Sequence, residues 1–139
     1  LYSSPRNLFV AGFIGSPPMN LIKVKYIPEK SLLKINNSYM DISNFKGIID
    51  EKATSNDLVL GFRPEYATIH RKCQMAEHLN GEVEIVELLE DRLSLDIRVA
   101  DQVIKVVVPG TYDVNIGDQV CIELNKFHLF DEKTEETIL

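Results

Sequence analysis

The chain of 139 residues has no tryptophan, two cysteines and no long apolar run. Two thiols, Cys73 and Cys121, are too few for a disulfide-built domain and fit a reducing compartment better, although the sequence leaves their pairing open. No apolar run approaches the roughly 18 residues that a membrane-spanning helix needs. The start has no charged segment that leads into a signal-like core with a cleavage site. We therefore expect a soluble protein.

Basic residues are also scarce. Fifteen Lys and Arg face 21 Asp and Glu, a net charge of −6, so the chain has no overall basic field for nucleic acid or an anionic membrane. A local basic groove stays open. The phosphate-cradling pattern GxxxxGK[ST] and the nucleophile pattern GxSxG are both absent. We therefore expect no catalytic, cofactor-binding or metal-binding residues in this chain.

The first half predicts several short strands. Ile22, Val24 and Tyr26 alternate with polar residues, and Asn36-Asn37 suits the tight turn of a hairpin over residues 31–43. Residues 58–62 form another alternating run, which Pro64 ends. The pattern weakens over residues 44–57, where 51–57 read as a polar loop. Residues 66–80 are ambiguous between a loop and a short helix.

The second half alternates more clearly. Residues 81–89 slip in phase at Val86, which predicts a bulge, and residues 92–99 place Leu93, Leu95, Ile97 and Val99 inward, with Ser94 among the outward residues. Residues 103–110 are apolar nearly throughout, which predicts a strand covered on both faces. Residues 120–130 form a closing strand before an acidic tail. Many short strands between turns predict a mainly β fold of small, closed or nearly closed barrels, with residues 66–80 dividing two units.

The first 20 residues predict a short α-helix before this β region. Ser4 suits its cap, Pro5 its first turn, and Gly15 its end. Phe9 and Phe13 lie one helical turn apart, and apolar residues cover most of the helix surface. Such a helix needs a packing neighbour. Because the chain opens on Leu1, we expect a fragment of something longer.

Two clusters contain residue types that can bind a metal ion or take part in acid/base chemistry. His70, Cys73 and His78 lie within nine residues and are zinc-ligand types, but their spacing matches no standard knuckle, so ordinary loop residues are the favoured interpretation. The second cluster is acidic. Its members are Glu82, Glu84, Glu87, Glu90 and Asp91. Glu82 and Glu84 alternate with positions that we expect to be buried, so a solvated strand face is favoured over acid/base chemistry.

Two short stretches are candidates for an interface or a structural corner. The first is GFRPEY, residues 61–66, where a strand delivers Phe62 and Arg63 to a corner at Pro64, followed by Glu65. Arg63 could pair with Glu65 or meet a partner's carboxylate, and a structural corner is favoured. The second is HLFDEKT, residues 128–134, where Phe130 and Asp131 precede a polar turn. An exposed Phe130 would indicate an interface and a buried one the core.

Four stretches together resemble one family. They are LYSSPRNLFVAGFIGSPPMN at the start, VLGFRPEY at the corner, GEVEIVELLEDRLSLDI after it, and VNIGDQVCIELNKFHLFDEKT near the end. The family comprises the ATP-binding subunits of carbohydrate-type ABC importers, of the maltose, glycerol-phosphate and multiple-sugar class. The resemblance implies two small OB-like barrels of the TOBE type. Residues 1–18 would be the last helix of a missing nucleotide-binding domain, and residues 19–139 the regulatory domain.

The resemblance also implies a role. The domain would hold two ATPase subunits together as a homodimer, and a regulatory protein or small ligand could act through it. ATP and Mg would bind the missing upstream domain, so the parent chain, and not this one, would be an ATP-hydrolysing enzyme. The parent would be a peripheral protein on the inner face of the cell membrane, where it would contact transmembrane permease subunits from the cytoplasm. Glu90-Asp91 departs from the family's glycine-containing turn, in a loop that could meet a partner.

Two alternatives remain at this point. An oxyanion-binding module would need backbone N–H groups with hydroxyl or lysine side chains nearby, and Gly110 with Thr111 is the best match. A nucleic-acid-binding OB module would need aromatic platforms in a positive groove, which the net charge disfavours.

Overall fold

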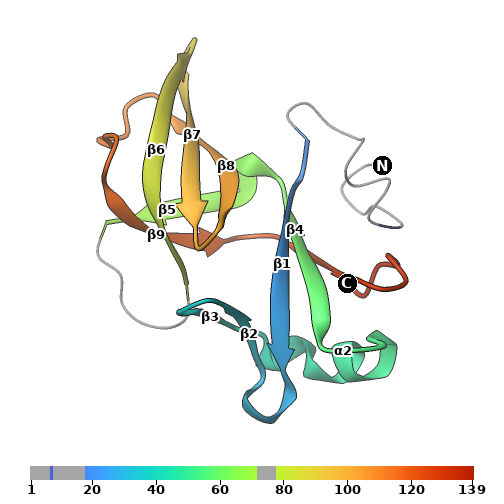
Figure 1. Ribbon diagram of the computed structural model, residues 1–139. Coiled ribbons are helices and arrows are strands. Elements are labelled where there is room, and N and C mark those ends of the chain that lie inside the picture. The colour runs from blue at the N-terminus through green and yellow to red at the C-terminus, as the bar shows by residue number, and fades with distance from the viewer. Residues whose placement is uncertain (1–6, 8–17, 72–77) are drawn as a thin grey trace.

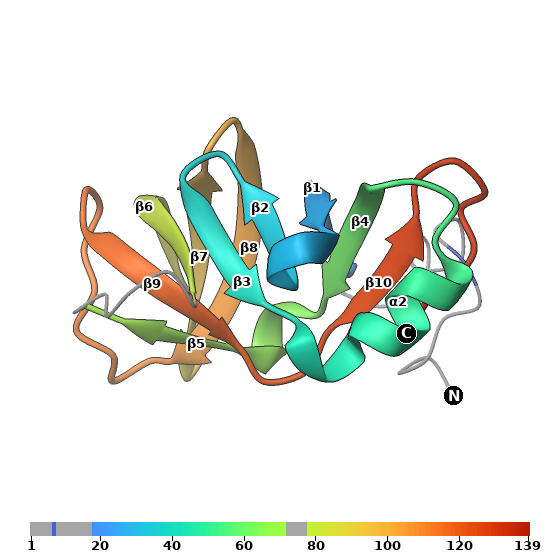
Figure 2. The same ribbon diagram turned by 90° about the horizontal axis from the view of Figure 1, so that it is seen from below.

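The computed structural model describes residues 7, 18–71 and 78–139. Its strands form two antiparallel five-stranded sheets, which lie side by side in Figures 1 and 2. The first sheet contains β1 (Asn20–Ile27), β2 (Leu32–Ile35), β3 (Ser38–Asp41), β4 (Asp57–Phe62) and β10 (His128–Asp131). The second contains β5 (Ala67–His70), β6 (Leu79–Leu89), β7 (Arg92–Val99), β8 (Gln102–Pro109) and β9 (Gln119–Leu124). The predicted mainly β, OB-like fold is confirmed.

The first sheet has the strand order β10-β4-β1-β2-β3. Its hairpin turns where the sequence predicts, because Asn36 takes the positive φ of 53° that a tight turn requires. A 3-10 turn, η2 (Ser43–Phe45), and the helix α2 (Lys46–Lys52) connect β3 to β4. The Tyr26 hydroxyl on β1 donates to the Asp50 carboxylate, 2.7 Å away, which docks α2 against the sheet.

The second sheet has the order β5-β9-β6-β7-β8. Its long β6–β7 hairpin projects from the molecule in Figure 1 and carries a register shift between Val83 and Ile85. The bulge that the phase slip at Val86 predicts is therefore present, slightly earlier in the strand. An extra residue there bends the hairpin.

The two sheets repeat one topology and exchange their last strands. Each has a three-stranded meander, a fourth strand beside the first of these, and a fifth strand beside the fourth. However, β5 follows β4 in the chain and joins the second sheet, while β10 follows β9 and joins the first. The two crossing connections touch, because the Asn125 N–H donates to the Tyr66 carbonyl at 2.8 Å. The halves of the chain are thereby interlocked.

One hydrophobic core serves both sheets, where the sequence predicted two small barrels. The main cluster of buried side chains includes Ile22 and Leu60 of the first sheet and Leu95 and Ile97 of the second. A smaller cluster contains Met19, Val59 and Phe130. A shared core follows from the strand exchange, because each half contributes a strand to the other sheet.

The described residues contain an α-helix that the sequence did not predict. The α-helix in the described part of the chain is α2, at a stretch where the apolar pattern is weak and residues 51–57 read as a loop. It buries Ile49 alone, so it leaves no helical stripe in the sequence. The helix predicted over the first 18 residues lies outside the described residues, apart from Asn7 and Pro18. Asn7 forms an isolated antiparallel bridge with Glu136.

Three local predictions are wrong. Residues 67–70 form β5, whose four residues are too few for their alternation to identify a strand. Strand β8 is covered on one face only, because Val103 is 47% exposed. Ser94, predicted to point to solvent, is buried although it lies on the same face as the exposed Arg98. Small side chains on a sheet are readily covered by larger neighbours.

Among the described residues, none of the helices combines the length and the apolar character needed to cross a bilayer. Cys121 is fully buried and disulfide-bonded. The pairing that the sequence left open is thereby answered for Cys121, whereas Cys73 lies outside the described residues.

Candidate functional site

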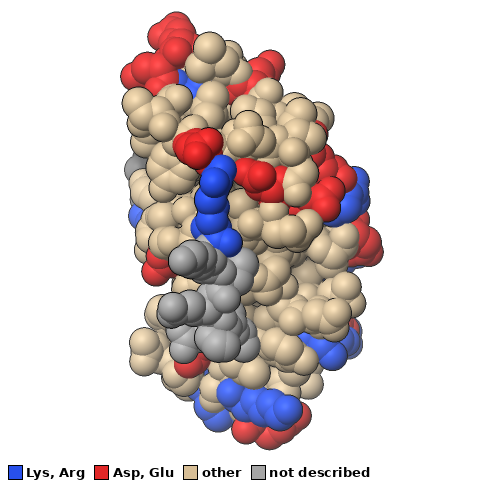
Figure 3. Space-filling model, turned by 90° about the vertical axis from the view of Figure 1, so that its left-hand side faces the viewer, with Lys and Arg blue, Asp and Glu red and all other residues tan. Residues whose placement is uncertain are grey.

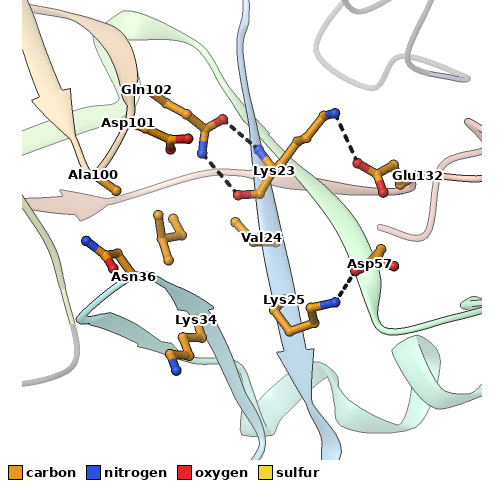
Figure 4. A pocket seen from close by; sticks show the side chains of 11 residues that line it. Lys23, Val24, Lys25, Lys34, Asn36, Asp57, Ala100, Asp101, Gln102 and Glu132 are labelled. Atoms are coloured by element: carbon orange, nitrogen blue, oxygen red, sulfur yellow. Dashed lines mark hydrogen bonds and ion pairs between the residues drawn. The ribbon is translucent and has the colours of Figure 1, made fainter.

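A polar groove of about 780 Å³ lies where the two sheets meet, and we call it the seam groove. One wall is the face of β1 and β2, and the other is the tight turn between β7 and β8, as Figure 4 shows. Its volume lies in the range typical of small-molecule sites. Its lining residues are Lys23, Val24, Lys25, Lys34, Ile35, Asn36, Asp57, Ala100, Asp101, Gln102 and Glu132.

Two lysines lie side by side on the sheet wall. Lys25 of β1 and Lys34 of β2 are direct cross-strand partners. Lys25 forms an ion pair with Asp57 at the start of β4, and this hydrogen bond lowers the pKa of the Asp57 carboxyl. Within the described residues, no carboxylate forms an ion pair with Lys34. In Figure 4 the two ammonium groups point in opposite directions.

Lys23 joins the two walls through its backbone. Its N–H donates to the Gln102 side-chain oxygen at 2.9 Å, and its carbonyl accepts from the Gln102 amide nitrogen at 3.2 Å. The side chain of Gln102 thus pairs, as a further strand would, with the part of β1 that β2 does not reach. The Lys23 ammonium lies 3.5 Å from Glu132, at an exposed position where such a pair contributes little.

A second amide mirrors this contact. Asn20 of β1 accepts from the Lys105 N–H at 2.7 Å and donates to the Lys105 carbonyl at 2.8 Å. Gln102 and Lys105 both belong to β8, so each of the two strands offers one amide to the other's backbone. We call these four hydrogen bonds the amide clasp. They fix β1 against β8 beside the seam groove.

The seam groove has a mixed lining. Val24, Ile35 and Ala100 are apolar, and the other lining residues carry ammonium, carboxylate or amide groups. Among the described residues that line it there is no hydroxyl or thiol nucleophile with a base beside it. Such a mixture can hold a small polar molecule. The lysine alternation in residues 20–26 looks like a solvated strand face, so only the pairing of β1 with β2 identifies this site.

The GFRPEY candidate is a corner between the sheets. Phe62 ends β4 in the core, and the 3-10 turn η3 (Pro64–Tyr66) carries the chain across to β5. Arg63 is partly buried and its carbonyl accepts from the Tyr66 N–H at 3.0 Å, while Glu65 is exposed. These positions agree with a structural corner.

Phe130 and Asp131 lie inside the molecule. Phe130 is fully buried beside Met19 and Val59, so it belongs to the core. The Asp131 carboxylate accepts four hydrogen bonds, from the N–H groups of Thr54, Lys133 and Thr134 and from the Thr54 hydroxyl. Burial alone would raise the pKa of this carboxyl, but the hydrogen bonds outweigh it and lower the pKa.

The remaining candidates that the structure describes do not line the seam groove. Phe9, Phe13 and Cys73 lie outside the described residues. The rings of His70 and His78 stack with centroids 6.0 Å apart, and His70 also pairs with Glu123 at 2.9 Å. Across the described part of the chain, no three His, Cys, Asp or Glu side chains are arranged to hold a metal ion.

The acidic residues lie on the surface of the β6–β7 hairpin. Glu84 pairs with Arg98 at 2.8 Å, and Glu82 accepts from Gln119. Glu90 takes a positive φ of 50° at the turn, where the exposed Glu90 and Asp91 carry the charge. Figure 3 shows acidic side chains gathered at the upper end of one face, whereas the basic ones on it are scattered.

Gly110 is not an open anion donor. Its N–H already donates to the Asp91 carbonyl at 2.8 Å, and a side chain on Gly110 would meet the same carbonyl oxygen at 2.7 Å. The absence of a side chain at Gly110 lets the β6–β7 turn pack closely against the end of β8. The oxyanion alternative built on Gly110 and Thr111 therefore loses its main backbone donor.

Comparison with known proteins gives consistent matches. Residues 15–67 match the model of the MalK OB fold domain. Over 99% of its length the chain is 30% identical to the oligosaccharides import ATP-binding protein MsmX of Bacillus subtilis, covering 39% of that protein. It is also 30% identical to the ABC transporter ATP-binding protein YcjV of Escherichia coli O157:H7, covering 38%. The maltose/maltodextrin import ATP-binding protein MalK of Vibrio vulnificus is 35% identical over 94% of this chain, which covers 36% of it.

The chain thus spans less than two-fifths of the length of these relatives. Among solved structures, the molybdate-bound form of the cytoplasmic molybdate-binding protein ModG aligns with a TM-score of 0.56 over 79% of this chain and 94% of that one. The two sequences are 9% identical, so this likeness concerns the fold alone.

Proposed function

We propose that this chain, whose residues 15–67 match the model of the MalK OB fold domain, is the regulatory and dimerisation part of an ATP-binding subunit of a sugar importer. The observation that carries the proposal is the similarity to sugar-import ATP-binding proteins along 99% of the chain. A match along the whole chain supports a shared role better than a match to one motif would.

The proposed role is mechanical. Two ATPase subunits must close over ATP and separate again in each transport cycle, and β domains that stay paired keep them at high effective concentration. The interlocked sheets suit this task, because a shared core transmits load between the two halves of the domain. A regulator bound here acts only through different affinities for the closed and open arrangements.

The proposal includes the surroundings of the parent protein. The parent subunit pairs with a second copy and with transmembrane permease subunits, and it lies peripherally on the cytoplasmic face of the membrane. ATP and Mg bind its nucleotide-binding domain, which carries the hydrolysis.

The direct test reads the coding sequence upstream of Leu1. We expect a segment of roughly 240 residues with a GxxxxGK[ST] loop, given the share of each relative that this chain covers. The encoded full-length protein should hydrolyse ATP, while residues 1–139 alone should not. A gene without any phosphate-cradling segment, or ATP hydrolysis by residues 1–139, would overturn the proposal.

A further inference from the structure

The last part of β6 is a sheet edge, and we call residues 85–89 the hairpin edge. Strand β6 pairs with β9 over residues 79–82. The Val83 N–H donates to the Asp118 carbonyl at 2.9 Å, and the Val83 carbonyl accepts from the Gly117 N–H at 2.8 Å. Beyond Val83, β6 pairs with β7, and no other strand in the described part of the chain adjoins it. An unpaired strand edge offers its backbone groups to another extended chain.

The backbone groups of Val86 and Leu88 point out of this edge. The turn between β6 and β7 consists of residues 90–91, so the flanking Leu89 and Arg92 exchange hydrogen bonds with each other. Along an antiparallel strand, successive residues direct their hydrogen bonds to opposite sides. The N–H and C=O groups of Val86 and Leu88 therefore face away from β7, where a further strand would meet them.

The hairpin edge also carries exposed apolar side chains. Leu88 is 68% exposed and Ile85 is 52% exposed. Leu88 lies opposite the buried Leu93 of β7, so it continues the core face of the sheet past the point where the core covers it. Val86 lies on the same face, because side chains alternate along a strand. A strand added here would cover Val86 and Leu88 with apolar side chains of its own.

The opposite face and the tip of the hairpin are acidic. Glu87 lies between Ile85 and Leu89 on the face away from the core. Residues 84–92 contain four carboxylates and one guanidinium group. The hairpin forms the upper end of the molecule in Figure 1, and Figure 3 shows acidic side chains gathered at that end. Two copies of this edge would bring their carboxylates together, whereas a basic chain would neutralise them.

We propose that the hairpin edge binds an extended segment of a protein partner, in which apolar residues alternate with lysine or arginine. The segment adds a strand to the second sheet, and its backbone bonds to Val86 and Leu88. Its apolar side chains cover Leu88 on the core face. Its basic side chains pair with Glu87 on the other face, where their aliphatic stems lie on the neighbouring apolar residues.

This binding deepens one element of the proposed function, a regulator that acts through the domain, and it rests on that function only for its consequence in transport. The hairpin edge takes up the segment whether or not a nucleotide-binding domain precedes residue 1. Failure of peptide binding and absence of a phosphate-cradling segment upstream are therefore separate results.

The test is an NMR titration of residues 1–139 with an eight-residue peptide in which lysine and valine alternate, acetylated and amidated at its ends. We expect saturable amide shifts along the hairpin edge. Amide hydrogen exchange at Val86 and Leu88 should slow by about tenfold or more at saturation, because their N–H groups gain acceptors. This slowing separates strand addition from loose attraction between opposite charges.

Two control peptides test the pattern of the segment. One has the same composition but places four lysines before four valines, and the other has glutamate in place of lysine. Both should bind at least about tenfold more weakly than the alternating peptide, because neither presents apolar and basic faces together. Equal binding of either control peptide would overturn the proposal.

Two matched variants locate the site. Leu88→Lys should weaken binding of the alternating peptide by about tenfold, because it removes an apolar contact and repels a basic segment. Val103→Lys makes the same change of charge on β8, at an exposed side chain away from the hairpin edge, and should leave binding unchanged.

Three results would overturn the proposal. They are equal effects of the two variants, unchanged exchange at Val86 and Leu88 in the parent chain, and no saturable shift at about 5 mM peptide, an affinity weaker than millimolar. Slower exchange at Val86 and Leu88 on raising the protein concentration without peptide would also overturn it, in favour of a second copy of this chain at the hairpin edge.

Discussion

The fifth strands of the two sheets differ sharply in their surroundings. All four residues of β10 are buried, whereas β5 alternates between buried and more exposed positions and forms the edge of its sheet. The C-terminal residues explain the difference. The Leu129 carbonyl accepts from the Ile138 N–H at 2.7 Å, and Asp131 donates its N–H to the Glu136 carbonyl at 2.9 Å, so the tail covers the outer edge of β10.

The comparison shows that two sheets of the same topology can hold their exchanged strands in different ways. The first sheet holds its exchanged strand by burial and by the Asp131 network, and it carries the lysine wall of the seam groove. The second sheet leaves its exchanged strand at an edge and extends the long β6–β7 hairpin. Both sheets depend on the exchange, since each takes its fifth strand from the other half of the chain.

Separating the halves should have the largest effect. Fragments 1–74 and 75–139, made apart, should each fail to fold, because the first lacks β10 and the second lacks β5. Mixing them should restore a common fold. Far-UV circular dichroism and amide NMR dispersion would measure this, with the intact chain as the control. Cooperative unfolding of either fragment alone would contradict the exchange.

Truncating the buried exchanged strand comes next. Phe130→Ala should lower the free energy of unfolding by about 3–5 kcal/mol, since the ring is fully buried. Urea denaturation would measure it. Leu88→Ala at the exposed hairpin end is the control, and it should change stability by less than about 0.5 kcal/mol. Similar losses at both positions would show that β10 is not part of the core.

The Asp131 network should show in the pH dependence of stability. Asp131→Asn should cost about 1–3 kcal/mol at neutral pH, because the Thr54, Lys133 and Thr134 donors lose their carboxylate. The pKa is lowered in the folded state, so this contribution is present above the ordinary value of about 3.9 and is lost as the pH falls through the folded-state pKa.

The comparison of unfolding free energies between pH 7 and pH 3 tests this directly. The difference between the parent chain and Asp131→Asn should shrink toward the acidic end. Asp113→Asn, at an exposed side chain, is the matched control and should show little change. A constant difference across this range would mean that the Asp131 pKa is not lowered.

Removing the amide clasp should have the smallest effect. Asn20→Ala and Gln102→Ala should each cost about 1 kcal/mol, the usual contribution of hydrogen bonds that partly exposed amides make. The double variant should show a coupling of about 0.5 kcal/mol or more, because both amides hold the same pair of strands. Asn44→Ala is the control. Strict additivity would indicate two independent contacts instead of one clasp.

The alternation of apolar residues predicts most of the strands well. Ile22, Val24 and Tyr26 are all buried, as are the inward residues of β7, and Asn36 marks the hairpin. Short or weakly patterned elements are missed: α2 buries Ile49 alone, and β5 has four residues. The single closing strand predicted over residues 120–130 is wrong: β9 and β10 are separate strands of different sheets, and periodicity does not show which sheet a strand joins.

The alternation of apolar residues predicts less of the candidate sites than of the strands. Phe62 and Arg63 were identified as part of a corner from Pro64 and the strand before it, which are local signals. The seam groove depends on the register of Lys25 with Lys34 and on a turn about 75 residues further along the chain. No local pattern encodes that meeting. The sequence signal that could have helped is the placement of lysines on both predicted neighbouring strands.

The central claim is that this domain holds two copies of its parent subunit together. Sedimentation equilibrium of residues 1–139, over a range that extends to high micromolar concentration, tests it most directly. We expect a reversible monomer–dimer equilibrium with twice the chain mass at the upper end. A single species of monomer mass at every concentration would contradict the claim.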